Sequence, residues 1–81
     1  MELNETVELM ESDDYKDRFK AEYYQTKERY TKLRAMCVKY EAGTLDFEPK
    51  CPLSLLNAQA RFMDNYLKAL EVRAQIEGIE L

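Results

Sequence analysis

Nine polar side chains recur along two predicted helices at the spacing of a helix face. Six of them, which we call the first polar row, are separated by steps of 3, 4, 3, 4 and 3 residues: Tyr15, Arg18, Glu22, Gln25, Arg29 and Lys32. The other three, the second polar row, recur at intervals of seven: Gln59, Tyr66 and Arg73. Residues three, four and seven positions apart lie on the same side of an α-helix, so each row lines one face.

The residue types in these rows suit a phosphate-bearing ligand. An arginine binds phosphate through two parallel hydrogen bonds, whereas a lysine offers a point charge. A tyrosine ring offers a face on which a nucleobase stacks, and its hydroxyl donates a hydrogen bond. Polar rows are also typical of solvated helices, in which Arg18 and Glu22 would form an ordinary ion pair four residues apart. Both interpretations are compatible with the spacing.

Catalysis has little support in the sequence. There is no histidine, no glycine-rich phosphate loop and no Glu-x-x-His metal pattern. The cysteines Cys37 and Cys51 do not make a usual zinc site without histidine, and we expect both to be reduced thiols. The carboxylates that could serve as acid and base are scattered: Glu22, Glu28 and Asp64. We therefore predict a protein that is not an enzyme, with no catalytic residues, no metal and no cofactor.

A heptad spacing of apolar and semi-polar residues predicts the first helix, over about residues 13–42. Its seam follows steps of 4, 3, 4, 3, 4 and 3 residues: Phe19, Tyr23, Thr26, Tyr30, Leu33, Cys37 and Tyr40. Ser12 is expected to cap its N-terminus. Gly43 is expected to end it, because glycine readily takes the left-handed conformation at a helix C-terminus.

The second helix is predicted over about residues 52–77. Pro52 suits its first position, and Gly78 is expected to end it. Its seam follows steps of 4, 3, 4, 3 and 4 residues: Leu56, Ala60, Met63, Leu67, Leu70 and Ala74. One short irregular turn, residues 43–51, joins the two helices, so we expect them to be antiparallel neighbours.

The lengths of these helices predict self-association. A helix of 30 residues is about 45 Å long, more than a compact domain of this size needs. Each helix also carries tyrosines or methionines beside its seam, which is more apolar surface than one partner helix covers. The predicted fold is therefore all-α: an antiparallel two-helix hairpin, residues 13–81, that oligomerises into a helical bundle as a dimer at least.

Charge divides the chain into an acidic leader and a mildly basic body. Residues 1–14 hold six carboxylates and no base, whereas residues 15–81 hold 10 acidic and 12 basic residues. We treat residues 1–12 as the leader. A short helix is compatible with its Leu3, Val7 and Met10, although so short a helix is marginal by itself, and Met10 is a plausible alternative start.

The overall charge and hydropathy exclude two classes of partner. The isoelectric point is about 4.8, whereas duplex DNA binding usually brings a value above about 9. No apolar run approaches the ~18 residues that span a bilayer. We expect a cytoplasmic protein without duplex nucleic acid or membrane partners, for which a small anionic ligand is the open possibility.

Two segments of the sequence, residues 15–33 and 55–73, resemble the helical hairpins of phage anti-CBASS and anti-Thoeris proteins, which are sponges for immune signals. The resemblance covers about 60 of the 81 residues. It is carried on the first helix by a Tyr-x-x-Arg-x-x-x-Glu pattern at Tyr15, Arg18 and Glu22. On the second helix, the matching positions are Leu55, Leu56, Gln59, Met63, Tyr66, Leu70 and Arg73.

The resemblance implies a function and a set of ligand-binding residues. Such proteins assemble into dimers to hexamers and bind cyclic di- or trinucleotides, or cyclic ADP-ribose isomers, without cleaving them. It implies that Tyr15 stacks on a base and that Arg73 holds a phosphate, with Arg29 or Lys32 as a second phosphate contact. Lys27 is a third possibility for that contact. The implied ligand-binding set is Tyr15, Arg18, Arg29, Lys32, Tyr66 and Arg73, in the cytoplasm of an infected bacterium.

A second class of function is compatible with the same helices. An adaptor or inhibitor would bind a host or viral protein through an exposed helix face. Such a protein would leave an exposed apolar patch. A sponge instead needs the polar rows intact and converging between subunits.

Overall fold

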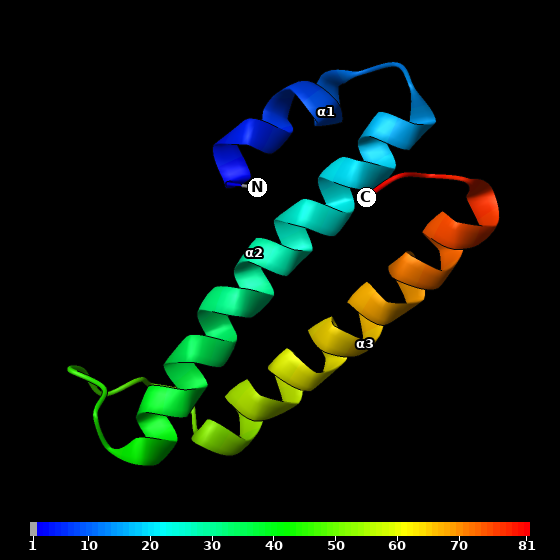
Figure 1. Cartoon of the computed structure of the whole chain (residues 1–81). Helices are drawn as coiled ribbons and strands as arrows, with labels where there is room; N and C mark the ends of the chain where they lie inside the picture. Colours follow the sequence, from blue (N-terminus) through cyan, green and yellow to red (C-terminus); the bar gives the residue numbers. More distant parts are fainter. Residues whose placement is uncertain (1) are drawn as a thin grey trace.

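The computed structural model describes residues 2–81, and most of them are helical (Figure 1). A 3₁₀-helix η1, Leu3–Thr6, leads directly into a short helix α1, Val7–Glu11. Two long helices follow: α2, Tyr15–Ala42, and α3, Leu53–Glu77. The predicted all-helical class is confirmed, and the described residues contain no strand.

Helix α2 begins two residues later than predicted, and its N-cap is Asp14 rather than Ser12. The Asp14 carboxylate accepts a hydrogen bond from the backbone N–H of Lys16 at 2.9 Å. The Ser12 hydroxyl instead accepts from the backbone N–H of Asp14 at 3.1 Å and donates to Asp17 at 2.9 Å. Ser12 therefore stabilises the turn before the helix, and the prediction of Ser12 as the cap was wrong.

Both long helices end at glycines, as predicted. Gly43 has φ of 76° and Gly78 has φ of 70°, the left-handed conformation that glycine adopts without strain. Pro52 is the N-cap of α3 rather than its first residue, so α3 begins at Leu53.

Helices α2 and α3 lie side by side and run in opposite directions (Figure 1). The predicted seams meet between them: Phe19 and Tyr23 pack with Leu67, Leu70 and Ala74. Towards the other end, the buried seam residues are Cys37, Leu56 and Ala60. Thr26 is also buried, and the remaining seam positions are half-buried: Tyr30, Leu33, Tyr40 and Met63.

Residues after Gly78 complete this core. The backbone N–H of Ile79 donates to the carbonyl of Ala74 at 2.8 Å, which turns the chain back over the end of α3. The Ile79 side chain is only 5% exposed and joins the cluster of Phe19 and Leu70.

No helix in the described part of the chain is long and apolar enough to cross a membrane.

One partly buried hydrogen bond joins Tyr23 of α2 to Glu71 of α3. The Tyr23 hydroxyl donates to the Glu71 carboxylate at 2.7 Å. Burial, helped by this carboxylate, raises the pKa of Tyr23 to about 12. Both effects favour the protonated phenol in the folded state.

This pKa predicts a loss of stability in strong base. The unfolded pKa is about 10, so the stabilisation is complete below pH 10 and is lost as pH rises from 10 towards 12. We expect the Tyr23→Phe variant to lack this component, which is about 1–3 kcal/mol. Urea unfolding at pH 9, 11 and 12 measures it. Parallel pH dependence in the wild type and the variant would contradict the assignment.

Candidate functional site

The clearest polar cluster lies where α2 begins and α3 ends. Arg73 donates through Nη2 to the Tyr15 hydroxyl at 2.5 Å and through Nε to Glu77 at 3.0 Å. Its guanidinium carbon lies 5.1 Å from the centre of the Phe19 ring, within cation–π range. We call Tyr15, Phe19, Arg73 and Glu77 the Tyr15–Arg73 cluster.

The electrostatics of this cluster leave a cation available to a ligand. The hydrogen bond and charge of Glu77 raise the pKa of Arg73 above its already high ordinary value, so the guanidinium stays charged. Arg73 has five N–H donors, of which Tyr15 and Glu77 engage two. The Arg73 side chain is 52% exposed. A phosphate reaching it would meet free donors on Nη1 and would compete with Glu77.

Tyr66 forms a second contact between the two helices. Its hydroxyl donates to Glu22 at 3.2 Å, and the hydroxyl of Thr26 donates to the same carboxylate oxygen at 3.1 Å. Burial raises the pKa of Tyr66, with Glu22 adding to the effect and Arg73 opposing it. Tyr66 lies seven residues before Arg73, or about 10 Å along α3. Members of both polar rows therefore pair across the junction of α2 and α3.

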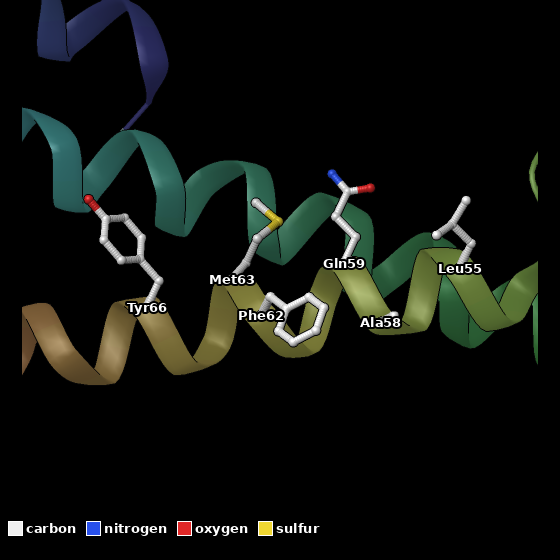
Figure 2. A pocket seen from close by; sticks show the side chains of 6 residues that line it. All are labelled: Leu55, Ala58, Gln59, Phe62, Met63 and Tyr66. Carbon is white, nitrogen blue, oxygen red and sulfur yellow. The ribbon is translucent and has the colours of Figure 1, made fainter.

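An open apolar hollow of about 550 Å³ adjoins Tyr66 on α3 (Figure 2). Its lining residues come from three consecutive turns of the helix: Leu55, Ala58, Gln59, Phe62, Met63 and Tyr66. Phe62 is 64% exposed and Leu55 is 57% exposed, so this surface is uncovered in a single chain. The prediction of ligand residues did not include Phe62. The signal for it is a second apolar stripe, Leu55, Phe62 and Tyr66, beside the seam.

Two members of the first polar row face the N-terminal residues. Arg18 donates through Nη1 to the carbonyl of Ser12 at 3.0 Å, and Gln25 donates to the hydroxyl of Thr6 at 2.9 Å. The ion pair expected between Arg18 and Glu22 is absent from the described residues, because these two side chains find different partners.

The other predicted phosphate contacts lie far from Arg73 within one chain. Arg29 and Lys32 follow Tyr15 by 14 and 17 residues, which is about 21–26 Å along α2. Lys32 pairs with Glu28 at 3.3 Å, and Arg29 is exposed. Lys27 lies 5.7 Å from the centre of the Tyr23 ring. The structure therefore brings Tyr15, Tyr66 and Arg73 to one region, and Arg29 and Lys32 to another.

A small helical protein with this exposed cationic and aromatic cluster has the character of a binding protein. The chain belongs to the Sequestin family, whose model matches residues 13–76. Sequestins are phage immune-signal sponge proteins, a binding family rather than an enzyme family. This confirms the resemblance drawn from the sequence. No curated protein and no solved structure matches the chain.

Proposed function

We propose that this protein is a sponge that binds a cyclic nucleotide immune signal, holds it without cleaving it, and so blocks antiviral defence inside an infected bacterium. Membership of the Sequestin family supports sequestration of a phage-directed signal. The observation that carries the assignment of a site is the Arg73 guanidinium, held between Tyr15 and Phe19 with free donors facing solvent.

The proposed ligand is a cyclic di- or trinucleotide or a cyclic ADP-ribose isomer. Arg73 would bind a phosphate through its free donors, and the exposed Tyr15 ring would stack on a base. Tyr66 would line the same region, with its hydroxyl protonated at neutral pH. Without histidine, the chain lacks the commonest base for phosphodiester cleavage.

The proposed site is completed by another copy of the chain. Arg18, Arg29 and Lys32 lie on the same row as Tyr15. Arg29 and Lys32 are about 21–26 Å along α2 from Tyr15, the residue that contacts Arg73. A second hairpin packed against the first would bring its own cations to the Tyr15–Arg73 cluster. We propose a homo-oligomer, from dimer to hexamer, in which hairpins assemble into a helical bundle.

A thermal-shift screen against cyclic nucleotides tests the function. The panel contains cyclic di- and trinucleotides and cyclic ADP-ribose isomers. A ligand present at 100 times its dissociation constant should stabilise the folded protein by about 2.7 kcal/mol. Absence of a shift across the whole panel would refute the sponge function.

The apolar hollow on α3 is the one observation that favours an adaptor instead. An adaptor would use Leu55, Phe62 and Met63 to bind a host or viral protein. In the proposed sponge, the same surface is covered by another copy of the chain. The two functions therefore differ in what covers Phe62.

A Phe62→Asp substitution separates these two possibilities. Phe62 is 64% exposed in the single chain, so we expect the helices to persist while the oligomer dissociates. Light scattering should give a multiple of 9.6 kDa for the wild type and a lower multiple for the variant. Val38→Asp, at a 48% exposed position on α2, is the control. A wild-type monomer at micromolar concentration would contradict self-association and favour the adaptor.

A further inference from the structure

The N-terminal residues form a separate layer on α2. The structure describes residues 2–12 of the acidic leader, and these precede the region matched by the family model. In the described part of the chain, η1 and α1 contact α2 but not α3, and they lie alongside the first half of α2 (Figure 1). The acidic leader holds four carboxylates and no basic side chain, whereas residues 15–34 hold seven basic side chains against three acidic ones.

The acidic leader occupies part of the first polar row. The carbonyl of Ser12 accepts the hydrogen bond of Arg18, and the hydroxyl of Thr6 accepts that of Gln25. Thr6 is fully buried against α2, and Ala21 of α2 is 1% exposed. Two of the six side chains in the row are thus engaged by the leader.

The leader is held weakly. It consists of two short helical pieces, neither of which has a side-chain cap at its start, and helices this short are marginal on their own. Three of its four apolar side chains remain exposed, Leu3 at 37%, Val7 at 42% and Met10 at 46%, and Leu9 is half-buried. Met10 contacts α2 through its sulfur, which accepts a hydrogen bond from Gln25 at 2.6 Å. Among residues 2–81, no ion pair joins the leader to α2. Its charges therefore attract the basic helix at longer range, and salt weakens that attraction.

We propose that the acidic leader is an intramolecular competitor of the ligand: docked, it covers one side of the first polar row, and an anionic ligand displaces it. The inference rests on the proposed function, because it takes this row as part of the anion-binding surface. The docked leader brings carboxylates close to the row, which repel a phosphate, while its Ser12 carbonyl and Thr6 hydroxyl engage Arg18 and Gln25. Release of the leader removes that repulsion and frees both side chains.

The test uses full-length protein with the triple substitution Glu5→Gln, Glu8→Gln and Glu11→Gln. Its control carries Glu41→Gln, Glu48→Gln and Glu80→Gln, which change the net charge equally at exposed sites outside the leader. The probes are sodium pyrophosphate and cyclic di-AMP at low ionic strength. We expect the leader variant to bind pyrophosphate about three to ten times more tightly than the wild type, and the control to change less than about twofold.

Nuclear magnetic resonance of the wild type provides the second readout. Saturating pyrophosphate should move the Thr6 amide resonance to the position of a disordered chain, because the leader has left α2. Equal affinities in the two triple variants, an unmoved Thr6 resonance, or no binding of pyrophosphate would each overturn the proposal. If pyrophosphate releases the leader but cyclic di-AMP and the rest of the nucleotide panel do not bind, the sponge function fails and the competing role of the leader stands.

Discussion

Replacing Leu70 with Asp is expected to unfold the protein at 25 °C. Leu70 is 3% exposed and belongs to the core cluster that includes Phe19 and Ile79. Truncating a buried leucine costs about 2–5 kcal/mol, and a carboxylate without a partner adds a further desolvation cost. A domain this small rarely has more than about 3–5 kcal/mol of stability from its core. Circular dichroism at 222 nm should therefore show most of the helical signal lost.

The matched control is Val72→Asp. It introduces the same side chain two residues further along α3, where Val72 is 59% exposed. The helix-propensity cost is larger for leucine than for valine but stays below about 0.7 kcal/mol in either variant, so a difference of several kcal/mol between them reports burial. We expect Val72→Asp to change the free energy of unfolding by about 0.5 kcal/mol or less. A Leu70→Asp variant that kept the wild-type signal would show that α2 and α3 do not pack through this seam.

Replacing Arg73 with Ala is expected to have the largest effect on ligand binding. It removes charged hydrogen bonds worth about 1.5–3 kcal/mol, which corresponds to a roughly 10- to 150-fold rise in the dissociation constant. Tyr15→Ala should cost about 1–3 kcal/mol through lost stacking. Because Tyr15 and Arg73 are in contact, the double variant should lose less than the sum of the two. Isothermal titration calorimetry with the ligand found by the thermal-shift screen measures all three.

Two controls test whether the loss of affinity in these variants comes from a lost ligand contact. Lys39→Ala removes the same charge from an exposed position in the last turn of α2, and it should change the affinity only slightly. Light scattering should give wild-type oligomers for Arg73→Ala, because Arg73 lies beside the seam. Loss of assembly in this variant would show that Arg73 is an interface residue rather than a ligand contact.

The packing of α2 on α3 was predictable because the residues that become buried recur at a regular spacing along each helix. Leucines and aromatics at steps of three and four identify one face of each helix, and that face is where Phe19, Tyr23, Leu67 and Leu70 meet. The glycine stops were predictable for a similar local reason, since only glycine takes the left-handed conformation easily. Such features depend on residues close together in the chain.

The features that could not be predicted depend on contacts between residues that are far apart in the sequence or that compete for the same role. Ser12 and Asp14 both carry a suitable capping oxygen, and the choice between them follows from the bond of Ser12 to Asp17. Docking of the acidic leader depends on Thr6 meeting Gln25, 19 residues away. Heptad spacing places six side chains on one face without saying which neighbour each will contact.

The side chains of the first polar row therefore contact two different parts of the chain. Tyr15 and Glu22 contact Arg73 and Tyr66 of α3, whereas Arg18 and Gln25 contact the acidic leader. The partners of Arg29 in an oligomer are likewise not determined by the spacing of one helix. The sequence therefore predicted which side chains share a helix face, but not which partner each of them contacts.

The central claim is sequestration without cleavage, and recovery of the bound ligand tests it most directly. The protein is incubated overnight with a stoichiometric amount of the nucleotide that binds it, separated from free ligand, and denatured by heat. Mass spectrometry then identifies the released nucleotide. We expect it to be the intact cyclic molecule, in a fixed ratio to protein chains. Recovery of a linear nucleotide would contradict the account, because it would show that this chain cleaves its ligand.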